Sequence, residues 1–119
     1  MHELSVAQNI IEIIQQSVSK QSWNQVRAVH VEIGAMAGIV PDSLKFSFEA
    51  ITEESAFRGS QLIIECIPFR IHCCSCSADT ENEDGFAVCG ECGCTNVKIV
   101  SGTELQIKNI ELVETAEVL

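Results

Sequence analysis

Residues 73–94 read CCSCSADTENEDGFAVCGECGC and decide how the second half of the chain folds. This stretch holds two Cys-x2-Cys pairs, Cys73/Cys76 and Cys89/Cys92, which are separated by twelve residues. Each pair can wrap a tight turn around one cation, and Zn²⁺ accepts four sulfur ligands in a tetrahedron without a competing geometry of its own. The spacing therefore predicts a structural zinc site, because four thiolates leave no open position for catalysis.

The same four cysteines admit other interpretations. They could hold iron as in rubredoxin, although Phe86 is the only aromatic residue of the module that could shield it. A thioredoxin-like dithiol fits less well, since neither pair opens a helix in a βαβ unit. Cys74 and Cys94 offer Cys-x-Cys pairings, although a two-residue spacer makes the better turn, and His72 could replace a thiolate or stay solvated. Cys66, on the apolar face of a predicted strand, is expected to be a small core residue.

The composition is that of an acidic chain of 119 residues, with 7 Lys+Arg, 17 Asp+Glu and a formal charge of −10. This length predicts one domain, or a small domain with a smaller module attached. The negative balance argues against a nucleic-acid partner, whose phosphates need a basic face. The longest apolar run, residues 33–40, is far shorter than the roughly 18 residues of a membrane span, so no membrane segment is expected.

The start of the chain bears on the redox environment of the cysteines. The chain opens with Met1-His2-Glu3 and shows no basic segment followed by an apolar one, so no secretory signal is expected. The expected location of the protein is therefore the cytoplasm. Cytoplasmic thiols stay reduced, and an odd number of cysteines, seven, cannot all pair within one chain. Both points favour metal binding over disulfide bonds.

Periodicity predicts the remaining secondary structure. The patterns predict helices over residues 4–19 and 41–53 and strands over residues 28–33, 61–68 and 104–114. The alternation of the last strand slips between Ile107 and Ile110, which suggests a bulge. Phe46, Phe48 and Phe57 are expected to lie in the core, and the acidic residues of 79–84 at a solvated hairpin tip.

These elements predict an α+β fold in which two helices pack on a small three-stranded sheet. Residues 1–69 and 99–119 are expected to form this discontinuous domain, and residues 70–98 an inserted zinc-ribbon-like module with the four cysteines. No long internal repeat or low-complexity tract interrupts this arrangement.

The N-terminal residues offer a second metal chelate. Bulky His2 should protect Met1 from removal, so that the α-amine of Met1, the amide nitrogen of His2 and its imidazole form fused chelate rings. The amide of Glu3 could complete a planar set of nitrogens, which suits Ni(II) or Cu(II) better than zinc. A motif this short also occurs by accident, and a terminal histidine is usually just solvated.

The order of the motifs along the chain carries a family resemblance. The chain starts with Met1-His2-Glu3, holds an inserted pair of Cys-x2-Cys motifs, and contains Gly34, Pro41-Asp42-Ser43-Leu44, Phe46-x-Phe48 and a closing Leu105-Gln106-Ile107-x-x-Ile110-Glu111. This order resembles the HypA/HybF hydrogenase nickel-incorporation proteins over essentially the whole chain. The resemblance implies a nickel metallochaperone that binds nickel through Met1, His2 and Glu3, with His2 indispensable, and zinc through Cys73, Cys76, Cys89 and Cys92.

The resemblance also implies partners. It implies a HypB-type GTPase, the large subunit of [NiFe]-hydrogenase and, in some organisms, urease, and it leaves monomer and homodimer open. The sequence itself contains no GxxxxGK[ST] loop and no clear nucleophilic constellation, so no enzymatic activity is expected. The competing interpretation is a zinc-ribbon protein-interaction module without nickel traffic. A third, electron transfer at iron, predicts a coloured protein.

Overall fold

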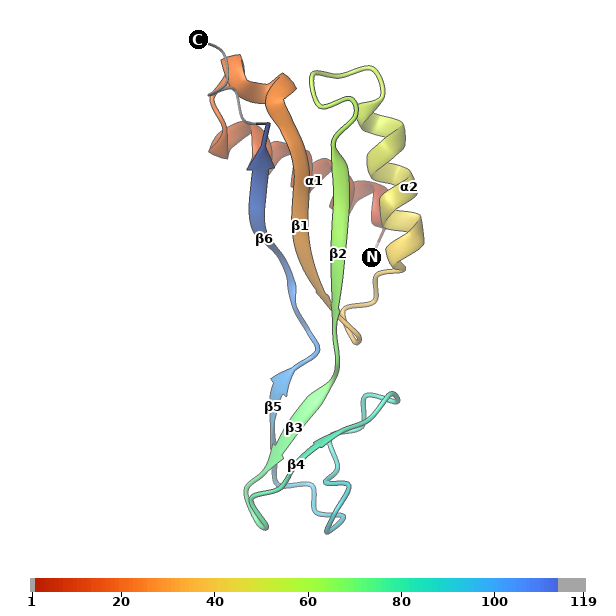
Figure 1. Cartoon of the computed structure of the whole chain (residues 1–119). Coiled ribbons are helices and arrows are strands. Elements are labelled where there is room, and N and C mark those ends of the chain that lie inside the picture. The colour runs from red at the N-terminus through yellow and green to blue at the C-terminus, as the bar shows by residue number, and fades with distance from the viewer. Residues whose placement is uncertain (1, 114–119) are drawn as a thin grey trace. The chain divides into compact units, whose positions relative to one another are not determined.

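The computed structural model describes residues 2–113, which divide by packing into two compact units (Figure 1). The described residues up to Val31, Ile39–Ile64 and those from Ile107 on form unit 1, and Glu32–Gly38 with Glu65–Gln106 form unit 2. In chain order the elements are α1 (Glu3–Ser17), the 3-10 helix η1 (Lys20–Gln25), β1 (Val26–Gly34), α2 (Pro41–Thr52), β2 (Gln61–Ile67), β3 (Arg70–Cys73), β4 (Asp79–Glu81), β5 (Val97–Ser101) and β6 (Leu105–Leu112).

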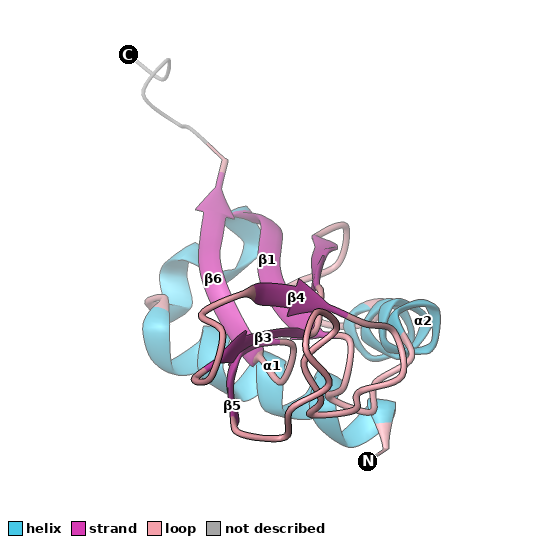
Figure 2. Ribbon diagram, turned by 90° about the horizontal axis from the view of Figure 1, so that it is seen from below, coloured by secondary structure: helices cyan, strands magenta, loops and turns pink. Residues whose placement is uncertain are grey.

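A three-stranded sheet of order β2-β1-β6 accompanies the two α-helices, which contact each other (Figures 1 and 2). The α+β prediction of two helices with a small three-stranded sheet is therefore confirmed. No helix within residues 2–113 is long and apolar enough to cross a membrane. The predicted module 70–98 lies within unit 2, but packing does not test whether either part folds alone, so the predicted domain bounds stay a prediction.

Helical spacing of apolar residues explains why α1 and α2 form and which faces they bury. In α1 the buried residues are Val6, Ala7, Ile10 and Ile14; Ile10 follows Val6 and Ala7 by four and three positions, and Ile14 follows Ile10 by four, so all share one face. Helix α2 starts with Pro41, which needs no amide partner in the first turn. Its fully buried residues are Leu44 and Phe48.

Three details of unit 1 differ from the sequence predictions or extend them. Phe48 and Phe57 are buried as predicted, but the prediction for Phe46 is wrong, since this side chain is 73% exposed. The predicted alternation of the first strand breaks at Ala28 and Val29, which are both buried. In the last strand only Ile107 and Ile110 are half-buried, three positions apart, and the bulge between them stays a prediction.

Unit 2 contains a second three-stranded sheet, of order β4-β3-β5, that periodicity did not reveal. Strand β4 occupies Asp79–Glu81, so the first part of the acidic segment is a paired strand and not a hairpin tip. On β3, Arg70 donates to Glu81 at 2.8 Å, and His72 pairs with Asp79 at 2.7 Å. Cys66 is exposed, so its predicted place in the core is wrong.

Two glycines allow the chain to cross itself closely within unit 2. A Cβ on Gly34 would lie 2.1 Å from the carbonyl carbon and oxygen of Gly102. The crossing is tied by hydrogen bonds from the Gly34 N–H to the Glu104 carbonyl and from the Met36 N–H to the Gly102 carbonyl, both 2.8 Å. Because the obstructing atoms belong to the backbone, no side-chain rotation can relieve the clash that any larger residue would cause.

Gly34→Ala should therefore lower the free energy of unfolding by roughly 1–3 kcal/mol, the usual cost of overpacking, measured by denaturant titration. Gly90→Ala is the matched control, because a Cβ there would meet only Thr80 atoms at 3.5 Å, an ordinary contact. An equal loss of stability in the two variants would contradict the close crossing as its cause.

Candidate metal centres

The four predicted zinc ligands lie together in unit 2. The Sγ atoms of Cys73, Cys76, Cys89 and Cys92 all lie within 4.8 Å of one another. The Cys73–Cys92 and Cys76–Cys89 sulfur pairs are each 3.6 Å apart. Four sulfurs at 2.3 Å from one tetrahedral ion would be about 3.8 Å apart, close to the two 3.6 Å separations, so the donor set suits a metal of this size.

The two Cys-x2-Cys turns are copies of one local structure. The N–H groups of Ser75 and Cys76 donate to the Cys73 sulfur at 3.3 and 3.4 Å, and those of Glu91 and Cys92 donate to the Cys89 sulfur at 3.4 Å each. These bonds orient the first sulfur of each turn toward the common centre and stabilise its thiolate.

Each turn closes on a residue with left-handed backbone. Ser77 (φ 63°) follows the first turn and Gly93 (φ 75°) follows the second, and each N–H donates to the carbonyl of the first cysteine of its turn, at 2.9 and 3.0 Å. Glycine adopts this conformation without strain, whereas Ser77 does so at a cost that the surrounding turn must offset. The repeated closure supports the two-residue spacer as the unit that builds the site.

The electrostatics of the cluster call for a cation. The N–H of Cys92, followed by that of Glu91, lowers the pKa of the Cys89 thiol to about 6. At Cys92 the N–H of Cys94 lowers the pKa, but the neighbouring sulfurs, Cys73 first, outweigh it and raise the pKa to about 12. Four thiolates this close therefore cannot coexist unless a positive ion neutralises them.

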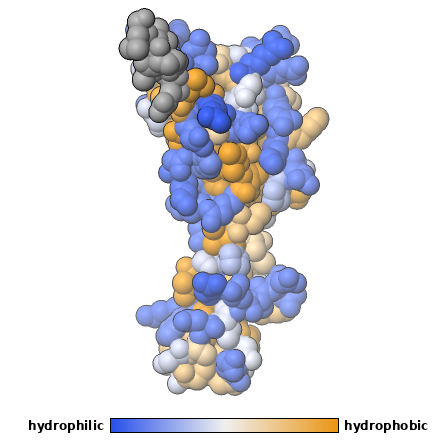
Figure 3. Space-filling model, viewed as in Figure 1, coloured by the Kyte–Doolittle hydropathy of each residue, from blue (hydrophilic) through white to orange (hydrophobic). Residues whose placement is uncertain are grey.

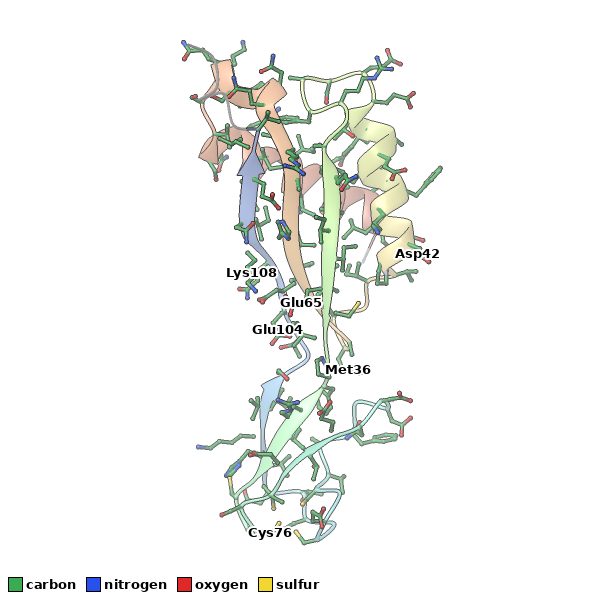
Figure 4. All side chains as sticks on the ribbon, in the orientation of Figure 1. Met36, Asp42, Glu65, Cys76, Glu104 and Lys108 are labelled. Atoms are coloured by element: carbon green, nitrogen blue, oxygen red, sulfur yellow. The ribbon has the colours of Figure 1, made fainter. Side chains whose placement is uncertain are left out.

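The other candidate ligands stay outside this cluster. Among residues 2–113, the four cysteines form the only group of three or more His, Cys, Asp or Glu side chains close enough to hold one metal ion. Cys74 is exposed, the Cys94 sulfur contacts the Ser75 hydroxyl at 3.3 Å, and His72 is paired with Asp79. Figure 4 labels Cys76, which lies in the turn that follows β3.

The N-terminal candidate lies in unit 1, at the start of α1. Met1 falls outside the described residues, while His2 is the N-cap of α1 and Glu3 its first residue. The Glu3 carboxylate accepts a hydrogen bond of 3.0 Å from the N–H of Val40, the residue that caps α2. This contact holds the beginnings of the two helices together.

An open depression of about 500 Å³ adjoins this N-terminus. It is lined by His2, Glu3, Leu4, Asp42, Ser43, Phe46 and Ser47. Asp42 brings a second carboxylate from the first turn of α2, as Figure 4 shows. The sequence patterns placed Asp42 only within the predicted helix 41–53 and Phe46 in the core. Their place beside His2 depends on how the two helices pack, which periodicity does not report.

The fold and the two candidate centres together define a small metal-handling protein. Residues 1–112 match the family model described as HypA, hydrogenase/urease nickel incorporation, metallochaperone. The chain belongs to this HypA family of nickel metallochaperones for hydrogenase maturation.

Individual relatives agree with this assignment over nearly their whole length. The hydrogenase maturation factor HypA of Geobacter metallireducens is 38% identical over 112 residues, covering 94% of this chain and 99% of the relative. HypA of Azotobacter vinelandii is 35% identical with the same coverage. The solution structure of the Ni metallochaperone HypA from Helicobacter pylori matches with a TM-score of 0.64 and 27% identity, over 95% of this chain and 98% of that one.

The Glu3–Val40 contact has a measurable pH signature. The Val40 N–H holds the pKa of the Glu3 carboxyl below its ordinary value of 4.5, so this interaction stabilises the folded chain above that value and is lost as the pH falls through the lowered pKa. The amide chemical shift of Val40 should titrate with a midpoint below 4.5, and Glu3→Gln should abolish that titration. A midpoint at or above 4.5 would contradict the hydrogen bond.

Proposed function

We propose that this chain binds Ni(II) at Met1, His2 and Glu3 and delivers it for maturation of [NiFe]-hydrogenase, while Cys73, Cys76, Cys89 and Cys92 hold a structural Zn²⁺. The observation that carries the nickel part is the position of His2 at the N-cap of α1, beside an open depression. Membership of a nickel-incorporation family supports the choice of nickel over copper.

The start of a helix suits a chelate built from backbone nitrogens. The first N–H groups of an α-helix have no acceptor within the helix, so a metal can replace the amide protons of His2 and Glu3 without breaking helical hydrogen bonds. With the imidazole and the α-amine of Met1 they make a planar nitrogen set, which Ni(II) prefers. Because the Glu3 carboxylate is engaged by Val40, the amide of Glu3 is the nitrogen assigned to the metal.

Two carboxylates balance the charge of the bound metal. The positive end of the helix dipole disfavours a cation at the N-terminus of α1. Glu3 and Asp42 both line the depression and offset this effect, and Asp42 can also supply an oxygen ligand. The site is open to solvent, so a partner can reach the metal and exchange ligands with it.

The zinc part rests on the donor set. Four cysteine sulfurs with this spacing suit Zn²⁺, which offsets half of the thiolate charge and cross-links the two turns when bound. The closed shell leaves no position for a substrate, and we assign no catalytic activity to the chain. A HypB-type GTPase and the hydrogenase large subunit, with urease as a further recipient, are the proposed partners, and the cytoplasm is the proposed place of action.

A nickel titration of wild type and His2→Ala tests the cargo site. Removing the imidazole takes away the one side-chain nitrogen of the set, so the Ni(II) dissociation constant should rise at least 100-fold by calorimetry, whereas zinc content should stay at about one per chain. His30→Ala is the matched control and should bind nickel like wild type, since His30 is paired with Glu111 on the sheet. Equal nickel binding by wild type and His2→Ala would favour the zinc-ribbon interaction module without nickel traffic.

Substitutions of Cys76 and of its near neighbour Cys74 test the zinc assignment. Cys76→Ser removes one of the four clustered sulfurs and should lower zinc content measured by atomic emission, with a drop in thermal stability because metal binding is coupled to folding. Cys74→Ser changes an exposed thiol outside the cluster and should retain about one zinc. Zinc lost with Cys74→Ser but kept with Cys76→Ser would overturn the ligand set.

A further inference from the structure

We propose that the loop of residues 82–88 in unit 2 is a docking surface for a partner protein, which receives Phe86 in an apolar pocket rimmed by lysine and arginine side chains. The proposed function assigns partners to the chain but no surface on which they bind. The inference rests on that function only for the choice of the proteins used as probes.

Phe86 leaves a large apolar surface in water. It is 66% exposed, more than any other large apolar residue among those described in unit 2, and Val88 two positions further on is 40% exposed. Aromatic side chains contribute a large share of the binding energy at protein interfaces. A single exposed apolar residue is nevertheless common on protein surfaces, so its exposure alone does not mark a binding surface.

The side chain of Asn82 fixes the backbone that presents Phe86. Its Oδ1 accepts hydrogen bonds from the N–H groups of Gly85 and Phe86 at 2.7 and 3.3 Å, and its Nδ2 donates to the Phe86 carbonyl at 2.8 Å. The Asn82 N–H donates to the Phe69 carbonyl at 3.4 Å, which ties the loop to β3 and its surroundings. A loop held in this way loses little conformational freedom when a partner binds.

Met36 fills the inner side of this loop. Gly85 has left-handed backbone (φ 80°), and a Cβ at this position would lie 2.4 Å from the sulfur of Met36. Figure 4 shows Met36 beside the loop that follows β4. The loop therefore packs against unit 2 through Gly85 and leaves Phe86, the next residue, in water.

Two carboxylates next to Phe86 have no basic partner within the chain. Glu83 and Asp84 are exposed and form no ion pair with any residue of 2–113, whereas Glu81 is paired with Arg70. Apolar and hydrophilic residues lie next to one another on the surface of unit 2 (Figure 3). A complementary partner therefore carries lysine or arginine around the pocket for Phe86, since opposite charges across an interface steer association and fix orientation.

The same carboxylates argue against other occupants. Anionic lipid headgroups and the phosphates of a nucleic acid would repel Glu83 and Asp84. A second copy of this chain would bring an identical acidic loop and its own formal charge of −10. A protein with a basic rim is the occupant that suits both the aromatic ring and the carboxylates.

Biolayer interferometry with two purified probes tests the docking surface: the HypB-type GTPase and the unprocessed large subunit of [NiFe]-hydrogenase. Phe86→Ser removes the anchor side chain and should raise the dissociation constant of the zinc-loaded full chain at least tenfold for one probe or both. Val100→Ser, at another exposed apolar residue of unit 2, is the control and should change it less than twofold. Equal affinities of wild type and Phe86→Ser for both probes overturn the proposal.

The double variant Glu83→Gln/Asp84→Asn tests the basic rim of the partner. Removing the two charges should raise the dissociation constant several-fold in 50 mM NaCl, and raising NaCl to 500 mM should weaken wild type more than this variant. Glu53→Gln/Glu54→Gln removes two adjacent exposed carboxylates from unit 1 and should bind like wild type. A variant at 83 and 84 that binds as well as wild type in both salts overturns the basic rim.

Asn82→Ala tests whether the fixed backbone matters. This variant keeps Phe86 and both carboxylates but loses the three hydrogen bonds of the Asn82 side chain. The dissociation constant should rise several-fold, and the Gly85 amide should exchange its hydrogen faster than in wild type. Faster exchange with unchanged affinity would contradict a preformed docking loop.

Nickel binding separates this inference from the proposed function. Phe86→Ser should keep its zinc and bind Ni(II) like wild type, because Phe86 lies in unit 2 and His2 in unit 1. If wild type and Phe86→Ser bind nickel and a probe equally well, only the docking surface is wrong. A wild-type chain that binds nickel but neither probe overturns the proposed partners and the docking surface together.

A vesicle arm tests the lipid alternative. Wild type should not bind vesicles of phosphatidylcholine and phosphatidylserine, because the acidic loop is repelled by the anionic headgroups. Vesicle binding by wild type that is lost in Phe86→Ser would identify a lipid surface as the occupant and overturn the protein partner.

Discussion

Four cysteine sulfurs within 4.8 Å of one another are the constraint on which unit 2 depends. The N–H groups of Cys92 and Glu91 lower the pKa of Cys89 to about 6, whereas the neighbouring sulfurs, Cys73 first, outweigh the N–H of Cys94 and raise the pKa of Cys92 to about 12. The apolar core of unit 2 is small, with Ile33, Phe69 and Ile71 as its large buried side chains. The Zn²⁺ proposed for this cluster would supply stabilisation that hydrophobic burial provides elsewhere.

Unit 1 is stabilised in the ordinary way, by burial of apolar side chains between helices and sheet. Ile14, Val29, Leu44 and Phe48 are fully buried and come from α1, β1 and α2. Because this core consists of apolar side chains, the N-terminus of α1 has a firm base that does not depend on the nickel proposed to bind there. That independence suits the proposed role of the N-terminus as a site from which a metal is released.

The parts of the fold that follow from local pattern were predictable from the sequence. Helical spacing located α1 and α2 to within about two residues at each end. The two Cys-x2-Cys pairs likewise predicted the cluster that the structure brings together, since each turn is a local structure with its own hydrogen bonds. Both succeed because the information lies within a few consecutive residues.

The failures other than Phe46 have the opposite cause, contacts between distant segments. Phe46 was expected in the core because it is aromatic and lies near Phe48, yet two positions along a helix turn a side chain to another face. The paired burial of Ala28 and Val29 and the close approach of Gly34 to Gly102 involve segments far apart in the chain. The place of Asp42 beside His2 depends likewise on helix packing. No single-sequence pattern carries such contacts.

The two candidate centres differ in how readily a ligand can be exchanged, and the difference follows from backbone hydrogen bonds. In each Cys-x2-Cys turn the first sulfur, of Cys73 or Cys89, belongs to a buried residue and accepts two N–H bonds, while Cys76 and Cys92 are exposed. Without a metal, the thiolates of Cys73 and Cys89 would lie beside two thiols whose pKa values are raised. The cluster therefore resists release of a bound metal. At the N-terminus the donors are helix-start amides without acceptors in the helix, and solvent can hydrate them when the metal leaves. A resident metal and a mobile one therefore each suit the site proposed for it.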